Sequence, residues 1–509
     1  MKILLVSPPT DAVETIPLGL AYIGAVLKQE GYEVHAMDGA APYANLTSAK
    51  IIKKAEELSP DVIGVSMNLY HIKEAYKIAS QLSRLGKPLI AGGPYPTIRP
   101  EEVLNNHFDI VVKGEGENTI LELLDYFKGN KALKDILGIS YRDNNGHIIH
   151  HPWSPFINDL DTLPFPAREL FPMRDYTTEE SLNNSMFWTT LVTSRGCPGV
   201  CTYCVATSAL GKKFRFRSAK SVYDEIKELN KRYGIRIFRF VDDAFTFDKE
   251  RLFELCDLVI NDSDLKDIIW DCDSRIVDVT EEMLIKMKEA HCVSIIYGIE
   301  SGDPETLKRI RKGVTLKKIK DVVDMTAKVN IPKVKINIMI GFPWENKSHI
   351  NNSINLLKEC NKKMEVIFGT TPIIPYPGSL LYETYHKEHG FTDWWLKNDA
   401  FPEVVGLDGR IPFYKRYILY IDNFALNKNF FKYNRSLKRY IEKAIVNTGK
   451  MVMRKTHGFL YAELLYTLAY FSLFLFRINP RLEYAIFSLL NHSSLKKTIK
   501  KLAMFGVLK

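Results

Sequence analysis

The sequence predicts an α/β protein with two parallel-sheet domains and a helical C-terminal domain. Short apolar runs alternate with helical patterns over residues 3–127 and again over residues 187–370. Such alternation is typical of parallel sheets covered by helices. A proline-rich stretch separates the two blocks, and beyond residue 390 the alternation stops. A chain of 509 residues is long enough to form two or three domains.

The first block, residues 1–145, has the pattern of a doubly wound parallel sheet. Its expected strands are residues 3–6, 34–37, 62–65, 88–91 and 110–112, with helices near 18–29, 48–58, 72–85 and 118–127. Ligands of such sheets bind beyond the carboxyl ends of the strands. The candidate binding residues there are Ser7, Asp38, Ser66, Gly92, Gly93, Pro94, Gly114 and Glu115. A dinucleotide site is not expected, because Pro8-Pro9 replaces the glycine-rich fingerprint after the first strand.

Residues 146–184 form the expected linker. Five prolines lie there (Pro152, Pro155, Pro164, Pro166 and Pro172), and few apolar residues recur periodically. Proline fixes φ and disfavours the helical region for the residue before it, so this composition predicts an extended connector.

The second block, residues 185–390, predicts a partial βα barrel. Six strands are expected at residues 187–192, 237–241, 268–272, 294–297, 334–340 and 365–370. Helical patterns fall between them, for example at residues 218–233, 281–290, 316–329 and 350–360. Barrels of this kind carry their chemistry at the carboxyl ends of the strands.

Three cysteines follow the first of these strands at the spacing C-x3-C-x2-C: Cys197, Cys201 and Cys204. Three thiolates on one short loop suit an iron–sulfur cluster in which one iron stays open to an external ligand. The spacing differs from that of a structural zinc site, and no histidine lies nearby to complete one. The other cysteines (Cys256, Cys272, Cys292 and Cys360) lack ligand spacing and are expected to be core thiols.

This trio, together with the aromatic Tyr203 before its last cysteine, resembles the radical S-adenosylmethionine (SAM) superfamily. The resemblance implies a [4Fe–4S] cluster whose open iron chelates the amino and carboxylate groups of SAM. It also implies SAM contacts at the ends of the later strands. The residues concerned are Tyr203, Asp242, Asp243, Arg275, Glu300, Ile338 and Gly341.

The first block resembles the cobalamin-binding domain that is fused to many radical SAM enzymes. The similarity lies in residues 17–23 and in the turn from Gly114 to Glu117, and the linker segment 163–168 resembles the connector of the same family. The motif Asp-x-His-x-x-Gly is missing, because Asp38 is followed by Gly39 and no histidine. We therefore expect cobalamin without a histidine on its lower face.

The resemblance spans about residues 1–385 and is greatest to the branch that contains the anaerobic magnesium-protoporphyrin monomethyl ester cyclase and hopanoid-processing enzymes. It implies reductive cleavage of SAM to a 5′-deoxyadenosyl radical, which takes a hydrogen atom from an unactivated carbon. We expect cobalamin-dependent C-methylation of a hydrophobic substrate such as a lipid, an isoprenoid or a tetrapyrrole. Oxidative cyclisation, hydroxylation or C–C coupling without methyl transfer remains the alternative. A reductase, flavodoxin or ferredoxin is the expected electron donor.

The sequence argues against two further functions. Methylthiolation of tRNA would need a second cysteine trio in the first domain, and residues 1–180 contain no cysteine. A cobalamin-binding or sensing module would not need the trio of the second block.

The expected C-terminal domain, residues 391–509, is aromatic and basic. Residues 404–509 carry 19 Lys and Arg against 5 Asp and Glu, which predicts contact with an anionic surface or substrate. The apolar stretch 458–476 fits a helix at the membrane interface or a helix packed in a core. RNA-binding signatures are absent, so no nucleic-acid partner is expected. The free cysteines and the lack of a signal-peptide pattern predict a cytoplasmic protein. The basic charge of the tail favours peripheral contact with the inner face of the membrane over a packed core helix.

Overall fold

The computed structural model describes residues 1–10, 15–41, 44, 46–176, 188–364, 366–389 and 392–396. Apart from residues 392–396, the expected C-terminal domain and its apolar stretch 458–476 lie outside the described residues. The two sheet domains described below belong to one compact unit of the chain, except for residues 367–371 of the last strand. No helix within the described ranges is both long enough and apolar enough to cross a membrane.

The first domain is a seven-stranded sheet in the order β2-β1-β3-β4-β5-β6-β7. Its strands are β1 (Lys2–Ser7), β2 (Glu33–Asp38), β3 (Val62–Ser66), β4 (Leu89–Gly92), β5 (Ile110–Val112), β6 (Ile139–Arg142) and β7 (Ile148–His150). The first five are parallel, and β6 and β7 add an antiparallel hairpin that the sequence analysis did not predict. The sheet thus extends to His150, five residues past the expected boundary at 145.

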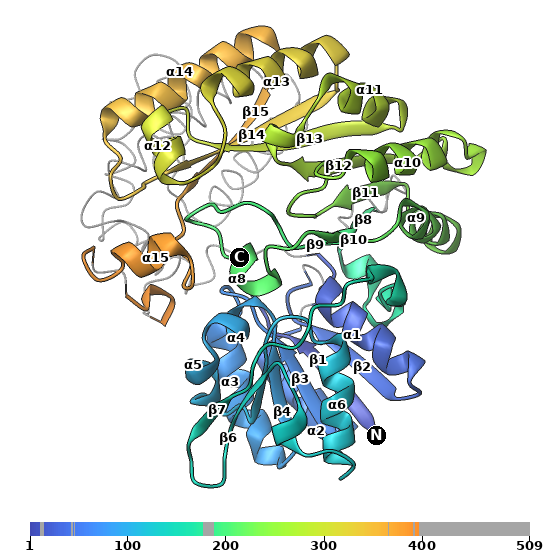
Figure 1. The fold of residues 1–509 in the computed structure, drawn as a ribbon. Helices are drawn as coiled ribbons and strands as arrows, with labels where there is room; N and C mark the ends of the chain where they lie inside the picture. Colours follow the sequence, from blue (N-terminus) through green and yellow to red (C-terminus); the bar gives the residue numbers. More distant parts are fainter. Residues whose placement is uncertain are drawn as a thin grey trace, which may run out of the picture. The chain divides into compact units, whose positions relative to one another are not determined.

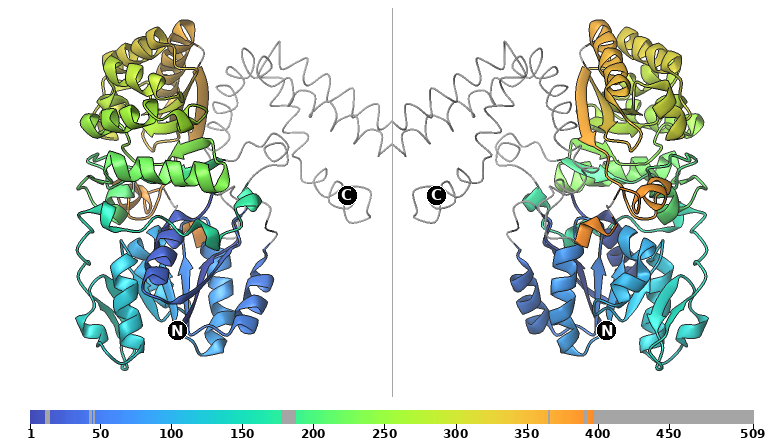
Figure 2. Two further views of the ribbon diagram at one scale, coloured as in Figure 1. Left: turned by 90° about the vertical axis from the view of Figure 1, so that its right-hand side faces the viewer. Right: turned by 90° about the vertical axis from the view of Figure 1, so that its left-hand side faces the viewer.

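Helices cover both faces of this sheet (Figure 2). They are α1 (Leu18–Gln29), α2 (Ser48–Leu58), α3 (Ile72–Leu82), α4 (Pro94–Ile98), α5 (Pro100–Leu104) and α6 (Glu117–Phe127). Alternate residues of β1 enter opposite cores: Ile3 and Leu5 pack with α1 and α6, whereas Leu4 and Val6 pack with α2 and α3. A strand buried on both faces reads as a continuous apolar run, which is why the sequence located these strands well.

The linker is a packed segment with three 3₁₀ turns, η3 (Leu160–Thr162), η4 (Arg168–Leu170) and η5 (Met173–Tyr176). Arg168 is only 2% exposed, although it lies in the stretch that the proline content marks as a connector. The linker is therefore anchored in the folded interior at some positions, such as Arg168, whereas others, such as Trp153 (43% exposed), lie at the surface.

The second domain has six strands in the order β15-β14-β13-β12-β11-β8. These are β8 (Trp188–Leu191), β11 (Ile237–Phe240), β12 (Ile269–Ser274), β13 (Cys292–Glu300), β14 (Lys333–Ile340) and β15 (Val366–Pro372). The strands from β8 to β14 pair in parallel, as predicted. A separate short ribbon joins β9 (Ser194–Arg195) to β10 (Arg215–Phe216).

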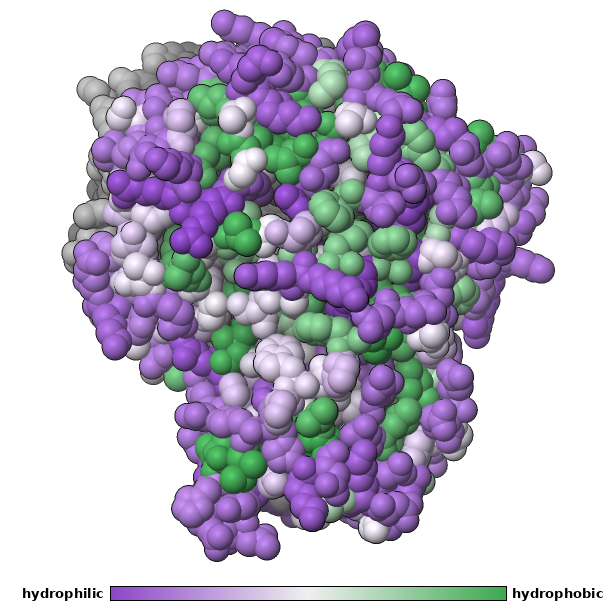
Figure 3. All heavy atoms as spheres, in the orientation of Figure 1, coloured by the Kyte–Doolittle hydropathy of each residue, from purple (hydrophilic) through white to green (hydrophobic). Residues whose placement is uncertain are grey.

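The helices of the second domain form an outer layer on its sheet (Figure 1). They are α9 (Ala219–Tyr233), α10 (Lys249–Ile260), α11 (Glu281–Glu289), α12 (Pro304–Arg309), α13 (Leu316–Val329) and α14 (Lys347–Lys363). Two shorter helices, α8 (Ala206–Leu210) and α15 (Leu380–Tyr385), follow the cysteine loop and β15. On the face shown in Figure 3, hydrophilic side chains cover most of both domains and hydrophobic atoms show as separate patches.

The four cysteines outside the trio are core thiols, as predicted. Cys256, Cys272, Cys292 and Cys360 are each at most 2% exposed. Cys272 lies on the helix-facing side of β12, because it alternates with the partly exposed Asp271 and Asp273 of the same strand.

Trp394 and Trp395 differ from the expectation for the C-terminal domain. The sequence placed them in the aromatic, basic tail, but both are buried in the core of the first domain. The ring centroid of Trp395 lies 6.1 Å from that of Tyr95, and the guanidinium of Arg99 lies 5.6 Å from the Trp395 ring. The chain thus returns from the second domain to the first after β15.

Candidate functional site

The cysteine loop begins at a turn that only glycine can form. Gly196 has φ +85°, and a Cβ at this position would lie 2.3 Å from the Lys213 carbonyl oxygen. The three thiols that follow are half-buried. The amides of Gly199 and Ala206 donate to Sγ of Cys197 and Cys204, each at 3.4 Å. Two of the three sulfur atoms therefore accept hydrogen bonds from backbone amides, and all three stay partly exposed.

Asp242, at the end of β11, anchors the base of this loop. Its Oδ1 accepts hydrogen bonds from the Thr193 amide at 2.8 Å and the Thr193 hydroxyl at 3.0 Å, and from Ser194. Burial raises the pKa of Asp242, although these donors and Arg251 oppose the rise. The other oxygen, Oδ2, has no hydrogen-bond partner in the part of the chain that the structure describes. The hydrogen bonds of Oδ1 therefore hold the base of the cysteine loop in place.

Asp243 and Arg275 lie beside the thiols with opposite charges. Burial raises the pKa of the Cys197 thiol, while the charge of Arg275 lowers it and that of Asp243 raises it. Burial likewise raises the Cys204 pKa to about 11, with Asp243 adding to the rise. Nη1 of Arg275 is buried without a hydrogen-bond partner among the described residues. A carboxylate and a guanidinium thus lie near the sulfur atoms, and the guanidinium is also 3.5 Å from the Asp278 carboxylate.

A buried triad of Tyr203, Glu300 and Lys312 lies on another side of the loop. Nζ of Lys312 is 2.8 Å from Glu300 Oε1 and 3.2 Å from the Tyr203 hydroxyl. The Tyr203 ring packs edge-on against Phe342 at 6.4 Å. The sequence analysis named Tyr203 and Glu300 but missed Lys312, because nothing in the local pattern links a lysine in the turn after α12 to the end of β13.

The last two predicted SAM residues lie at the end of β14. Ile338 is fully buried, and Gly341 has φ +108° in the turn that follows the strand. Glu345 closes this turn, because its Oε2 accepts from the Gly341 amide at 2.7 Å and the Phe342 amide at 3.2 Å.

The predicted residues of the first domain meet at one edge of its sheet. Ser7 pairs with Asp38 across β1 and β2, and Ser66 pairs with Gly92 across β3 and β4. Gly93 has φ +102°, and a Cβ there would lie 2.8 Å from the Met67 carbonyl oxygen. Pro94 then starts α4. The backbone of this edge is therefore close-packed at Gly93.

Two of the predicted acids in the first domain are occupied by other side chains. Asp38 is buried, and it accepts from the Tyr176 hydroxyl of the linker and from the Ala40 amide. Glu115 accepts from Arg195 at 3.1 Å and from Arg215 at 2.7 Å. Both carboxylates therefore already have hydrogen-bond partners within the protein.

Glu115 and Glu117 connect the edge of the first sheet to the cysteine loop. Arg195, two residues before Cys197, donates to Glu115 and, at 2.5 Å, to Glu117. These side chains are 5–11% exposed. Nearby, Gly114 has φ +73°, and a Cβ there would lie 2.8 Å from the Trp153 ring. The loop after β5 and the cysteine loop are thus in direct contact.

A second contact joins the loop after β3 to the turn after β15. The hydroxyls of Tyr70 and Tyr376 are 3.1 Å apart. The Cys204 thiol is close enough to Tyr376 to raise its pKa further, after the larger effect of burial. The carboxyl edge of the first sheet and the cysteine loop therefore border the same region.

Comparison with known proteins identifies the family. Residues 191–357 match the model of the radical SAM superfamily, and residues 10–124 match the B12 binding domain. An uncharacterized methyltransferase of Pyrococcus horikoshii is 34% identical, over 75% of this chain and 83% of that protein. The chain belongs to the B12-binding radical SAM family.

Other members of this family include enzymes of two reaction types. The cytidylyl-2-hydroxyethylphosphonate methyltransferase of Streptomyces wedmorensis is 28% identical, over 77% of this chain and 83% of that enzyme. The anaerobic magnesium-protoporphyrin IX monomethyl ester cyclase of Synechocystis is 27% identical, over 65% of this chain and 67% of the cyclase. The family resemblance seen in the sequence is thereby confirmed.

The fold matches that of solved cobalamin-dependent SAM radical enzymes. OxsB, a cobalamin-dependent SAM radical enzyme solved with aqua-cobalamin, has a TM-score of 0.67 and 17% identity, over 97% of this chain and 76% of that one. At this identity the likeness shows the fold alone. The α/β fold class predicted from the sequence is confirmed.

Membership of the B12-binding radical SAM family assigns three cofactors, a [4Fe–4S] cluster, SAM and cobalamin, and such enzymes need an electron donor and a small-molecule substrate. The residues present fit the first two cofactors. Three half-buried thiols with amide donors suit a cluster, and Asp243 with Arg275 suits the amino and carboxylate groups of SAM. Among the described residues no group of His, Cys, Asp and Glu is gathered tightly enough for a single metal ion. A cubane differs from such an ion, since each thiolate binds a different iron.

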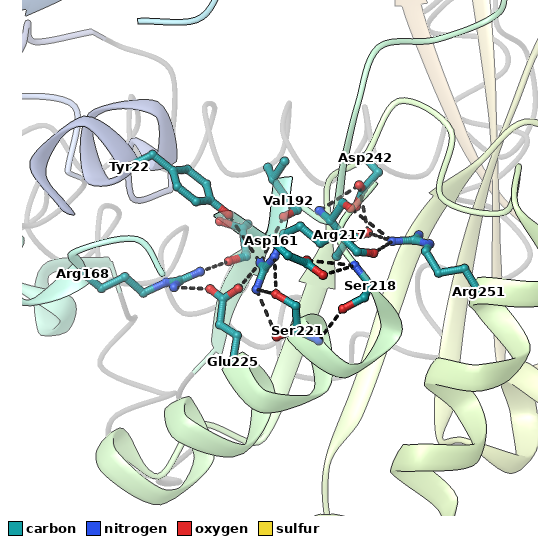
Figure 4. A network of polar contacts seen from close by, with 12 residues as sticks. Tyr22, Asp161, Arg168, Val192, Arg217, Ser218, Ser221, Glu225, Asp242 and Arg251 are labelled. Atoms are coloured by element: carbon teal, nitrogen blue, oxygen red, sulfur yellow. Dashed lines mark hydrogen bonds and ion pairs between the residues drawn. The ribbon is translucent and has the colours of Figure 1, made fainter. Parts of the chain in front are cut away.

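The radical SAM domain is tied to the linker and the B12-binding domain by the polar network of Figure 4. Glu225 of α9 is fully buried and accepts from both Arg168 and Arg217. Arg168 also donates to the Thr190 carbonyl at 2.9 Å, and Arg217 donates to the Tyr22 hydroxyl at 3.4 Å. The charges of the two arginines hold the pKa of Glu225 below its usual range although burial opposes this.

Proposed function

We propose that this enzyme methylates a carbon atom of a small-molecule substrate, with SAM and cobalamin as cofactors. The observation that carries the proposal is the 34% identity to a protein named as a methyltransferase, over 83% of that protein. The contact between the loop after β5 and the cysteine loop supports it, because methyl transfer needs cobalt, SAM and substrate carbon in one space.

The residues have distinct roles in this proposal. Cys197, Cys201 and Cys204 hold the cluster, and the edge of the first sheet from Ser7 to Glu115 holds the corrin. When bound, the cluster supplies the electron that cleaves SAM and the cobalamin supplies the methyl group. Asp243 would accept from the ammonium of SAM, and Arg275 would donate to its carboxylate. Asp242 keeps the cysteine loop in place.

Oxidative cyclisation is the second candidate function. It is supported by the relatives named as magnesium-protoporphyrin IX monomethyl ester cyclases, of which one is 27% identical. In that reaction cobalamin would not donate a methyl group. The higher identity to a methyltransferase favours methyl transfer.

The expected hydrophobic substrate rests on the aromatic tail, which lies outside the described residues. Charged side chains on the inner face of the second sheet are evidence that part of the substrate is polar. Arg239 of β11 is 3.6 Å from Asp271 and 3.7 Å from Asp273 of β12, so neither pair makes a hydrogen bond. These side chains are 27–43% exposed. We propose that a substrate lying over this face carries a charged or hydrogen-bonding group.

The experiment that tests methyl transfer uses SAM labelled in its methyl group. The reconstituted enzyme is incubated anaerobically with a reductant, cobalamin, labelled SAM and a metabolite extract, and label is followed into products. The proposal expects label in a product that depends on added cobalamin. Formation of 5′-deoxyadenosine and an unlabelled, oxidised product would contradict methyl transfer and favour cyclisation.

A further inference from the structure

Lys312 forms a buried ion pair beside the cysteine loop, and nothing in the proposed function uses it. The side chains of Lys312 and Glu300 are 12% and 11% exposed. Lysine and glutamate are seldom buried, because removing each ion from water is costly unless good partners replace the solvent. The pair therefore needs an explanation beyond packing.

The backbone around Glu300 is shaped to hold this pair. Glu300 has φ +71°, an unfavourable value for a residue with a side chain, and the pairing of β13 with β14 shifts register between Gly298 and Glu300. A Cβ on Gly298 would lie 2.5 Å from Glu300 Oε1 and 3.2 Å from Lys312 Nζ. Strain of this kind persists where the surroundings enforce it, and it clusters at functional sites.

The ammonium of Lys312 is close to two of the three cysteines. It interacts electrostatically with Cys201 and Cys204 as well as with Glu300. Tyr203, which accepts a hydrogen bond from Nζ at 3.2 Å, lies between these two cysteines in the sequence. Because the triad is buried, solvent screens these interactions weakly.

We propose that the buried ammonium of Lys312 favours the reduced state of the cluster held by Cys197, Cys201 and Cys204, and that Glu300 fixes the ammonium in place. The inference rests on the proposed ligand set. Reduction adds one electron from the external donor, and therefore one negative charge, to the cluster. A nearby positive charge stabilises the more negative state, and net charge is one of the ways in which a protein sets a cluster potential.

The two members of the pair should shift the potential in opposite directions. Lys312→Met removes the positive charge and leaves the Glu300 carboxylate uncompensated, so the midpoint potential falls. Glu300→Gln leaves the ammonium uncompensated, so the potential rises. The double variant should lie between the two single variants, and below the wild type, because the ammonium is the member of the pair that interacts with Cys201 and Cys204. A purely structural role would not produce opposite signs.

The test is a redox titration of the anaerobically reconstituted protein without SAM, followed by electron paramagnetic resonance, with iron counted in each variant. We expect Lys312→Met and Glu300→Gln to change the reduction equilibrium about tenfold in opposite directions, which is about 59 mV each. Lys312→Arg keeps the charge and serves as the control.

Shifts of the same sign, or none in variants with full iron, would overturn the proposal. If Lys312→Met fails to assemble a cluster, the test is the midpoint potential of Glu300→Gln, which should be higher than that of Lys312→Arg. Wild-type protein that holds no cluster would instead show that the ligand assignment is wrong.

Discussion

At the scale of single residues, the site depends on backbone conformations that few side chains tolerate. Gly196 is the clearest case, because it combines φ +85° with a carbonyl oxygen 2.3 Å from the place of a Cβ. The turn at Gly196 leads the chain from β9 into the cysteine loop. Any side chain here must displace backbone of the opposing strand.

We therefore expect Gly196→Ala to lose iron binding. Gly129→Ala is the matched control, because Gly129 has a similar φ of +82° but nothing lies within 4 Å of its Cβ position. Both variants should lose about 1 kcal/mol or more of stability from the strained φ. Iron and sulfide analysis after reconstitution should show loss only in Gly196→Ala. Equal iron in both variants would contradict the role of this turn.

Glu345 gives a pH dependence with a defined sign. Burial raises its pKa to about 7, although the amides of Gly341 and Phe342 lower it. The folded protein thus binds this proton more tightly than the unfolded chain does, so stability falls as pH rises from about 4.5 through about 7.

The check on Glu345 is a series of thermal melts across this pH range. Glu345→Gln keeps an acceptor for the two amides but cannot titrate. We expect the wild type to lose stability relative to Glu345→Gln as the pH rises. Parallel curves for the two proteins would show that the carboxyl does not titrate in this range.

At the scale of elements, the contact between the loop after β5 and the cysteine loop joins the two proposed cofactor sites. Arg195 belongs to β9, and its partners Glu115 and Glu117 belong to the B12-binding domain. All three side chains are nearly buried, so the loss of one leaves an uncompensated charge.

We expect Arg195→Met to cost about 3–5 kcal/mol of stability, as for other broken buried pairs. Glu117→Gln in the same background should add less than it does alone, which gives a coupling energy of about 0.5–3 kcal/mol. Chemical denaturation of the four proteins of this cycle measures that energy. Simple additivity would show that the pair is not coupled.

The sequence predicted elements well where their apolar runs are long and buried on both faces, as in β1, β3 and β14. It missed β6 with β7 and β9 with β10, because strands of two to four residues leave little pattern. From spacing it predicted a cluster on the thiols of Cys197, Cys201 and Cys204, which the structure places half-buried on one loop. It could not find Lys312, or the pairing of Glu115 with Arg195, because these contacts join residues that are 12 and 80 positions apart.

At the scale of the whole chain, a buried carboxylate of the second domain helps to hold the linker in place. Glu225 accepts from Arg168 of the linker and from Arg217, which also reaches Tyr22 of the first domain (Figure 4). Removing this acceptor leaves two buried guanidinium groups without their counter-ion.

Glu225→Gln should therefore loosen the linker. We expect a loss of about 3–5 kcal/mol and faster proteolysis within residues 151–176. Glu228→Gln on the same helix is the control, because Glu228 pairs with Arg232 at the surface, where ion pairs contribute at most about 1 kcal/mol. Cleavage at the wild-type rate in Glu225→Gln would contradict the role of the network.

The central claim is that two separate sites in one chain hold the cluster and the cobalamin. The most direct measurement counts iron and cobalt per chain after anaerobic reconstitution with hydroxocobalamin, in the wild type and in Cys201→Ala. We predict about four irons and one cobalt in the wild type, and lost iron with retained cobalt in the variant. Full iron in Cys201→Ala, or a wild type that binds no cobalt, would contradict this account.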